Sequence, residues 1–292
     1  MNEFKTYHPI VNFIYFLCVI GFSMFLMHPV SLGITLICAL LYTLVLKGGK
    51  AALRGVAMVI PVMLLAAVIN PMFNHAGITV LMYLPSGNPL TAESFYYGIA
   101  AAAMLAAVIL HFSSYNQVMT SDKFVYLFGK IIPTLSLVLS MTLRFVPAFI
   151  ERLKEIVSVQ RTLGRDVSGG SILKRIRCAM KILSILITWS LESAVETADS
   201  MKSRGYGLPG RTAYSIFHFD KRDLKALLWM LCLTLIIFAG IYYKVLNYSY
   251  FPIFKTGKFS IFTAAVHGAY FLLCVTPVII ELREEYRWKA IK

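Results

Sequence analysis

Long apolar runs separated by short polar or basic segments recur along the chain. A helix that crosses a membrane needs roughly 17 to 25 mostly apolar residues, and several of these runs reach or approach that length. The first run follows Lys5 as a signal peptide would, but it lacks a small-residue cleavage site and leads directly into a second run, so we expect it to stay in the protein. The pattern predicts six membrane spans, at residues 11–27, 30–46, 55–69, 95–112, 224–243 and 259–280.

Between the fourth and fifth runs, the pattern changes to helices that are apolar on one side and polar on the other. Apolar residues at helical spacing around and after Pro147 predict a first amphipathic helix: Phe145, Phe149, Leu153 and Ile156. A second helix carries a comparable stripe, Ile187, Leu191, Ala194, Val195 and Ala198, with Glu192, Glu196, Asp199 and Ser203 nearly opposite. The turn "DVSGG" (166–170) separates the two helices. We therefore expect two long cytoplasmic helices joined by a short glycine turn.

These patterns divide the chain into three regions. Residues 1–112 and 224–292 hold the predicted spans, and residues 113–223 hold a membrane-associated segment followed by the two amphipathic helices. Within the middle region, the segment 123–147 is apolar but contains charged residues. It is either an interfacial or bundle-packed helix or an additional span.

Composition places the chain in the membrane. It is 58% hydrophobic and 14% charged, whereas an ordinary soluble domain is roughly 45 to 50% apolar and about 25% charged. The predicted fold class is an all-α integral membrane protein with about six transmembrane helices and long amphipathic cytoplasmic coupling helices.

The net charge of +14 is explained first by orientation, since Lys and Arg stay on the cytoplasmic side. The loop "KGGKAALR" (47–54) is basic, while residues 70–94 contain no Lys or Arg. This predicts that both termini are cytoplasmic, although Lys244, Lys255 and Lys258 then fall on the outer side.

Signatures of catalysis and of metal binding are missing from the sequence. No G-x-x-x-x-G-K-[ST] loop is present, so if ATP drives the protein, another subunit must bind it. The six histidines form no pair at helical spacing, and the five cysteines form no C-x-x-C pair. We expect no catalytic residue, no cofactor and no metal site in this chain, and therefore no enzyme.

Two helix ends have similar sequences, "SVQRTLGRD" (158–166) and "SMKSRGYG" (200–207). Each is rich in basic residues and reaches a glycine. Basic residues in a last helical turn can simply complement the helix dipole, which is worth about 0.3 to 1 kcal/mol. Alternatively, Arg204, with the small neighbours Ser203 and Gly205, could reach into a partner's groove, where its forked guanidinium suits a carboxylate.

These two ends, with "NPMFNHAGITVLMYL" (70–84) and "KFVYLFGKIIPTLSLVLSMTLRFVP" (123–147), make the chain similar to a known family. It resembles the transmembrane (T) component of energy-coupling factor (ECF) transporters, the EcfT or CbiQ-like family. The resemblance implies a coupling subunit of an importer for a vitamin or a transition-metal ion, in a bacterial or archaeal cell membrane. It also implies partners: two ABC ATPase subunits, which hydrolyse ATP, and a membrane-embedded substrate-binding S component, which is reoriented.

The resemblance further implies two ATPase-docking motifs of the type Ala-Arg-Gly, at the ends of the coupling helices. Ser203, Arg204 and Gly205 correspond to the second motif.

The first motif departs from the family pattern. When it is aligned on Gln160 and Gly164, Leu163 takes the position of the arginine, and Arg161 and Arg165 lie on either side. Either a neighbouring arginine makes the contact or this docking point is more apolar.

Arg144 and Pro147, in "LRFVP", match another pattern of the family. As structural residues, Pro147 bends or starts a helix and Arg144 extends to the membrane interface. As functional residues, they form a hinge that passes motion into the bundle.

Two other functions of the chain stay open at this point. One is a self-sufficient gradient-driven permease or channel, and the other is a scaffold whose basic centre binds anionic lipid.

Overall fold

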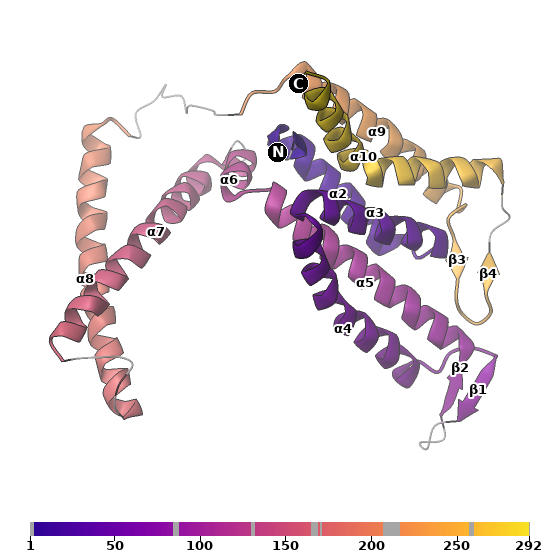
Figure 1. The fold of residues 1–292 in the computed structure, drawn as a ribbon, viewed down its shortest axis with the longest axis horizontal. Coiled ribbons are helices and arrows are strands. Elements are labelled where there is room, and N and C mark those ends of the chain that lie inside the picture. Colours follow the sequence, from indigo (N-terminus) through magenta and orange to yellow (C-terminus); the bar gives the residue numbers. More distant parts are fainter. Residues whose placement is uncertain are drawn as a thin grey trace. The chain divides into compact units, whose positions relative to one another are not determined.

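The computed structural model describes residues 3–83, 88–129, 132–164, 169, 171–206, 217–256 and 260–291. In these ranges the chain is helical apart from two short hairpins, which confirms the predicted all-α class (Figure 1). It divides into two compact units, one of residues 1–120 and 217–292 and one of residues 121–216.

The first unit contains most of the apolar helices. Its N-terminal elements are α1 (Glu3–Thr6), α2 (Pro9–Phe25), α3 (Pro29–Lys47), α4 (Gly49–Phe73), β1 (Val80–Tyr83), β2 (Pro89–Thr91) and α5 (Ala92–Val118). Its C-terminal elements are α9 (Lys221–Tyr242), β3 (Tyr248–Ser249), β4 (Lys255–Thr256) and α10 (Ile261–Ile291). Strand β1 pairs antiparallel with β2, and β3 pairs antiparallel with β4.

The second unit consists of α6 (Ser121–Gly129), α7 (Pro133–Thr162) and α8 (Ile172–Ser203). Pro147 lies inside α7, so it does not start a helix, and that part of the structural interpretation is wrong. Pro147 has no N–H to donate to the carbonyl four residues earlier, yet α7 continues on both sides of it.

Each predicted span coincides with one helix, α2, α3, α4, α5, α9 or α10. Six described helices are long and apolar enough to cross a membrane, but they are not the same six. Helix α2, with 17 residues, is slightly shorter than the others, and α8 qualifies through its apolar stripe, with the lowest mean hydropathy of the six, 1.4. Helix α7 is not among them, so the described part of segment 123–147 adds no candidate span.

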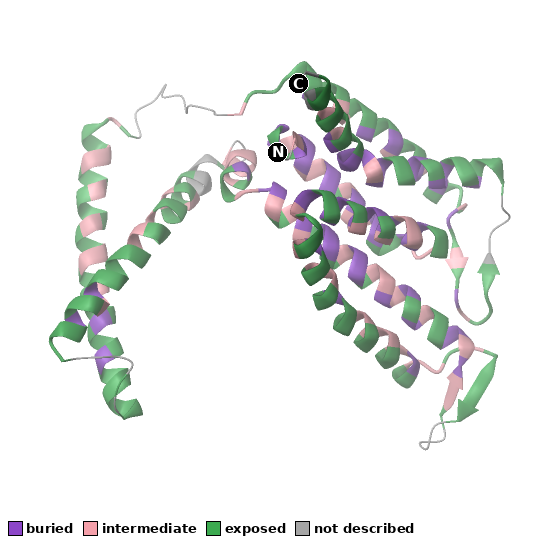
Figure 2. Ribbon diagram, in the orientation of Figure 1, coloured by how far each residue is buried: buried purple, intermediate pink, exposed green. Residues whose placement is uncertain are grey.

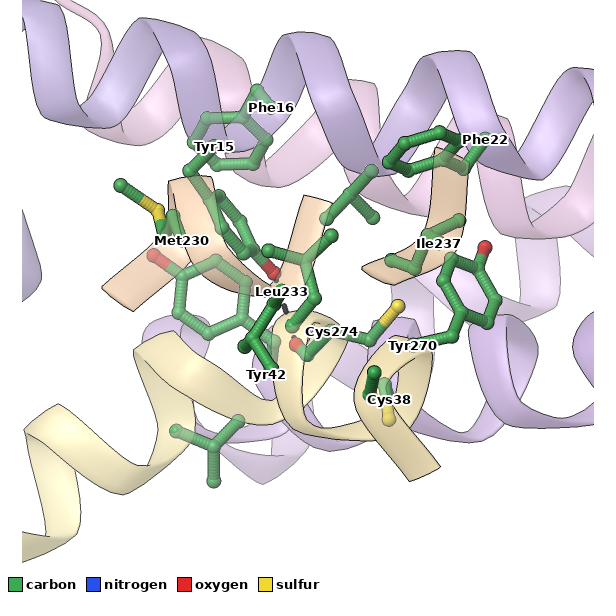
Figure 3. Packing of buried hydrophobic residues seen from close by; sticks show 14 of the residues in the cluster. Tyr15, Phe16, Phe22, Cys38, Tyr42, Met230, Leu233, Ile237, Tyr270 and Cys274 are labelled. Carbon is green, nitrogen blue, oxygen red and sulfur yellow. Dashed lines mark hydrogen bonds between the residues drawn. The ribbon is translucent and has the colours of Figure 1, made fainter. Parts of the chain in front are cut away.

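Aromatic side chains from α2, α3 and α10 form the core of the first unit (Figure 3). Tyr15, Tyr42 and Tyr270 are fully buried. The Tyr15 hydroxyl donates a hydrogen bond to the carbonyl oxygen of Cys274 at 2.9 Å, and the hydroxyls of Tyr270 and Thr35 are 2.6 Å apart. These bonds satisfy polar groups that an apolar core would otherwise leave unpaired at a cost.

Two carboxylates fix the N-terminus of the first unit. Glu281 of α10 accepts hydrogen bonds from the backbone N–H groups of Glu3 and Phe4, at 2.9 and 3.1 Å. Asp223 of α9 accepts one from the N–H of His8 at 3.0 Å. The start of the chain therefore lies beside α10 and the start of α9.

Helices α4 and α5 approach closely at Gly98. A methyl group at this position would lie 2.9 Å from the carbonyl oxygen of Ala67 and 3.2 Å from Cδ of Pro71. Small residues allow this kind of backbone approach in membrane proteins.

We expect Gly98→Ala to lower the free energy of unfolding by about 1 to 3 kcal/mol, because the backbone of α4 cannot move away as a side chain can. Thermal unfolding in detergent measures the change. Gly268→Ala is the matched control, since a methyl group there meets no heavy atom within 4 Å. Equal stability of the two variants would show that α4 and α5 do not pack this closely.

Candidate docking site at two helix ends

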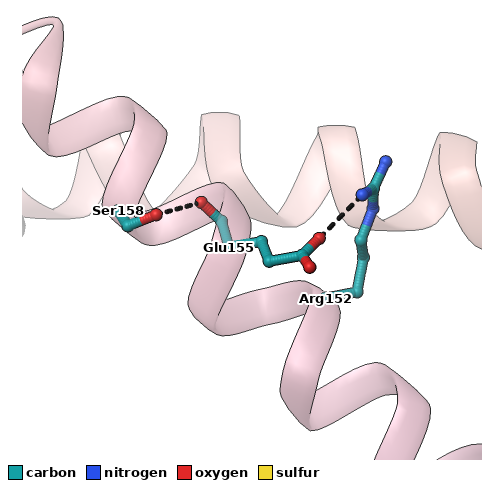
Figure 4. A network of polar contacts seen from close by, with 3 residues as sticks. All are labelled: Arg152, Glu155 and Ser158. Atoms are coloured by element: carbon teal, nitrogen blue, oxygen red, sulfur yellow. Dashed lines mark hydrogen bonds and ion pairs between the residues drawn. The ribbon is translucent and has the colours of Figure 1, made fainter.

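A contact between Phe149 of α7 and Trp189 of α8 joins the two long helices of the second unit. The ring centroids are 5.5 Å apart and the rings are nearly perpendicular, at 88°. The Arg152 guanidinium lies 5.5 Å from the Trp189 ring centroid, in position for a cation–π interaction. Arg152 also pairs with Glu155 at 2.8 Å, and the hydroxyl of Ser158 donates to the Glu155 carbonyl (Figure 4).

The buried residues show that the two helices run in opposite directions through this contact. Beyond Phe149, the buried residues of α7 are Ile156 and Gln160, whereas those of α8, Cys178 and Ile182, precede Trp189. Most other residues of the two helices are exposed or half-buried (Figure 2). The far ends of α7 and α8 therefore lie on opposite sides of the contact.

We call residues 159–164 the first tip and residues 200–206 the second tip. Each tip begins about three helical turns beyond the Phe149–Trp189 contact, so its end lies roughly 20 to 25 Å from it at 1.5 Å per residue. The separation of the two tips is then on the order of 40 Å. Figure 1 shows the two helix ends apart, and the structure does not bring the two predicted motifs together.

The second tip ends in a compact glycine cap. Gly205 has a φ of +73°, and its N–H donates to the Lys202 carbonyl at 3.0 Å. The Tyr206 N–H donates to the Met201 carbonyl, also at 3.0 Å. This pair of bonds is the Schellman motif, which needs a left-handed residue that glycine adopts without steric cost.

The first tip repeats this geometry as far as it is described. Gly164 has a φ of +74°, and its N–H donates to the Arg161 carbonyl at 3.0 Å. The hydroxyl of Thr162 donates to the carbonyl three residues earlier at 2.7 Å, as that of Ser203 does at 2.8 Å in the second tip. Arg165 lies outside the described residues.

The shared cap aligns the tips residue by residue. Leu163, with φ −82° and ψ 11°, occupies the C-cap position that Arg204 occupies with φ −84° and ψ 6°. Two residues before the C-cap, Arg161 in the first tip corresponds to Lys202 in the second. The backbone geometry thus agrees with the alignment on Gln160 and Gly164, and it gives the two tips different side chains at the same place.

The side chains at these positions are exposed, except for the glutamine. Leu163 is 63% exposed, and Arg204 and Ser203 are also exposed. Gln160 is 8% exposed, and its Oε1 has no hydrogen-bond partner within the described residues. The glutamine thus faces the helix pair, while the C-cap side chains face outward.

Arg144 and Pro147 lie in α7, well before the first tip. Both side chains are exposed, one helical turn apart. Both residues are more than ten residues before the first tip along α7, too far to touch it. Any hinge role would therefore act through α7 itself.

A hollow of about 550 Å³ runs along α7 beside the first tip. It is lined by Leu153, Lys154, Val157, Ser158, Arg161 and Thr162. Sequence reasoning did not identify it, although the spacing of Lys154, Ser158 and Arg161 places them on one face. Arg161 and Leu163 therefore have different surroundings, one on the hollow and the other on the cap.

Distant segments also bring together two histidines in the first unit. The rings of His28 and His267 have centroids 4.8 Å apart, a pairing that their spacing in the sequence could not indicate. Within the described residues no group of three or more His, Cys, Asp or Glu side chains is placed to hold a metal ion.

We expect Gly205→Ala to destabilise the second tip by about 1 to 2 kcal/mol, because an alanine is strained at positive φ. Amide hydrogen exchange of residues 201–206 should become roughly tenfold faster, since 1.4 kcal/mol corresponds to a factor of ten in an opening equilibrium. Gly49→Ala is the control, since Gly49 has no positive φ and open space around it. Unchanged exchange at the second tip would contradict the cap.

Comparison with known proteins bears on the identity of the chain as a whole. No family model matches the chain. Curated relatives do match, and the proteins are named energy-coupling factor transporter transmembrane protein EcfT. The chain is 38% identical to the protein from Lactobacillus helveticus over 101 residues, which is 34% of this chain and 36% of the relative.

Other relatives give the same result. The chain is 41% identical over 90 residues to EcfT of Bacillus selenitireducens, covering 30% of this chain and 34% of the relative. It is 35% identical over 105 residues to EcfT of Streptococcus thermophilus, covering 36% and 40%. The match spans about a third of the length of the first of these relatives. Over that part, this multi-pass membrane protein resembles the transmembrane component of energy-coupling factor transporters, as its sequence predicts.

Proposed function

We propose that the chain is the transmembrane coupling (T) subunit of an ECF-type ABC importer. It would link ATP hydrolysis by two ABC ATPase subunits to reorientation of a substrate-binding S component, for uptake of a vitamin or a transition-metal ion. The observation that carries the proposal is the pair of matching helix caps, on opposite sides of one helix contact, in a chain similar to EcfT.

The two caps support docking to two partners of the same kind. Each tip offers an exposed C-cap side chain next to a glycine that leaves space around it. With a separation on the order of 40 Å, the two tips can contact two separate partners. Because the helices are joined at Phe149 and Trp189, a force on either tip would be transmitted to the other helix.

The tips differ in the contact that each would make. Arg204 would pair with a carboxylate in a groove of one ATPase, where the guanidinium can bind both oxygens. Leu163 would fill an apolar part of the corresponding groove, with Arg161 or Arg165 able to supply a charge beside it. Arg144 and Pro147 would form the hinge between the tips and the membrane helices.

The remaining assignments follow from the same proposal. Residues 113–223 form the coupling region, and residues 1–112 and 224–292 form the membrane regions. The chain itself hydrolyses no ATP, and it lies in a bacterial or archaeal cell membrane with both termini in the cytoplasm. The hydrogen bonds that Glu281 accepts from the N–H groups of Glu3 and Phe4 support placing the N-terminus on the same side as the end of α10.

We expect Arg204→Glu to abolish copurification of the ATPase pair or to uncouple ATP hydrolysis from uptake. Truncating one member of a buried hydrogen-bonded charge pair costs about 2 to 5 kcal/mol, and reversing the charge costs more. Lys202→Glu is the matched control, because it makes the same charge change two residues earlier on the exposed surface. Arg204→Lys should also impair docking, since lysine cannot bind a carboxylate in the same forked geometry.

Normal uptake in the Arg204→Glu variant would reject docking at the second tip. The purified chain alone, in liposomes with an ion gradient, provides the second control. Solute uptake there would favour a gradient-driven permease and contradict the coupling role.

For the first tip, we expect Leu163→Ala to weaken assembly with the ATPases, by about 1 to 3 kcal/mol if the leucine is buried in the groove. Arg161→Ala and Arg165→Ala are made in parallel and assayed by the same copurification. If only the leucine change impairs assembly, the first dock is apolar. If only one of the arginine changes impairs assembly, that arginine makes the contact in place of the family's arginine, and the hypothesis of an apolar dock is wrong.

A further inference from the structure

The charged residues at the start of α8 are arranged against the helix dipole. Basic residues occupy its first three turns, at Lys174, Arg175, Arg177 and Lys181, while Glu192, Glu196 and Asp199 lie in its last three turns and Lys202 in its final turn. Acidic residues are favoured near a helix N-terminus and basic residues near the C-terminus. Helix stability therefore does not explain this order, and the basic end needs another explanation.

The basic end is open to solvent in the described structure. Lys174, Arg177 and Lys181 are exposed, and no described carboxylate is paired with any of the three. The side chain of Ser171, at the N-cap, makes no hydrogen bond to the first backbone N–H groups of the helix. At about 100° per residue, the three basic side chains lie on one side of the helix.

Large apolar side chains lie on the adjoining face of the same turns. Ile172 is 73% exposed, Leu173 70%, Ile176 55% and Met180 61%. They are separate from the face that packs in the helix pair, where Cys178 and Ile182 are buried. Figure 2 shows the start of α8 as largely exposed, with its buried residues confined to the region near α7. Basic and apolar groups side by side are typical of a helix that lies at a membrane surface.

We propose that residues 172–181 bind the bilayer surface, with Lys174, Arg177 and Lys181 on the headgroups of anionic phospholipids and Ile176 and Met180 among the acyl chains. We call this the lipid-binding surface of α8. Attraction to anionic lipid amounts to roughly a fivefold gain in binding for each basic residue near the surface. The exposed apolar side chains favour lipid over nucleic acid, which would contact the cations but leave those side chains in water.

The acidic half of α8 limits where this contact can lie. Glu192, Glu196 and Asp199 would be repelled by the same anionic headgroups. The helix therefore cannot lie along the membrane surface over its whole length, and only its first three turns bind there. This inference does not depend on the proposed ATPase partners, because it concerns the opposite end of the helix from Arg204.

The experiment measures lipid contact with the full chain in vesicles and without any ATPase. The chain keeps its three native tryptophans, because Trp189 joins α7 and α8. Leu173→Trp adds one reporter on the lipid-binding surface, and its quenching is the difference from the parent chain. Quenching by brominated phosphatidylglycerol is compared with quenching by brominated phosphatidylcholine at equal mole fraction. We expect the anionic lipid to be preferred by at least about fivefold.

Charge variants show whether the cations cause this preference. The triple variant Lys174→Gln/Arg177→Gln/Lys181→Gln should reduce the preference to about onefold, and Lys174→Arg/Arg177→Lys/Lys181→Arg should retain it. The matched control Glu192→Gln/Glu196→Gln/Asp199→Asn neutralises three charges on the same helix and should not reduce it. Equal quenching by both lipids, no quenching by either, or a preference that survives the glutamine variant would each overturn the proposal.

Discussion

The perpendicular contact of Phe149 with Trp189 determines where the two tips of the second unit lie. Because α7 and α8 run in opposite directions through it, the chain ends each helix on a different side of the contact. Ion pairing between Arg152 and Glu155 holds the guanidinium near the indole ring, and the ring contact and cation–π interaction are each worth about 0.5 to 1 kcal/mol or more. Packing of parallel helices would instead have brought the two tips to one end of the pair.

In each tip the glycine cap fixes the backbone, while the residue at the C-cap supplies the exposed side chain. Positive φ at Gly164 and Gly205 stops each helix at the same point and turns the preceding residue outward, whatever its side chain is. The leucine at one C-cap and the arginine at the other are therefore alternatives on one scaffold. An apolar contact and a charge-assisted hydrogen bond differ in their response to salt, since screening weakens exposed ion pairs but not apolar burial. Under the proposed docking, the contacts of the two tips should then differ in salt sensitivity although their backbones match.

The apolar runs were sufficient to predict the long helices of the first unit, because a spanning helix needs an apolar run of characteristic length. They could not predict that Tyr15, Tyr42 and Tyr270 meet, or that His28 lies beside His267, since those contacts depend on which helices become neighbours. The glycines of "SVQRTLGRD" and "SMKSRGYG" did predict where the two long helices end, because glycine marks a helix end in sequence and in structure. Whether α8 crosses the membrane could not be decided from its sequence, for a physical reason. Its apolar stripe gives it the length and mean hydropathy of a span. Its charged residues, however, are typical of a helix with one face in water.

The uneven charge of α8 has a further consequence for motion. If the first three turns are held at anionic headgroups, the helix cannot translate freely along the bilayer normal, because that would withdraw both cations and apolar side chains from their contacts. A displacement of Arg204 would then be converted into rotation of α8 about its held end, and the Phe149–Trp189 contact would carry α7 with it. The acidic turns near the second tip favour this outcome, because their repulsion from the same headgroups keeps the moving end away from the membrane surface.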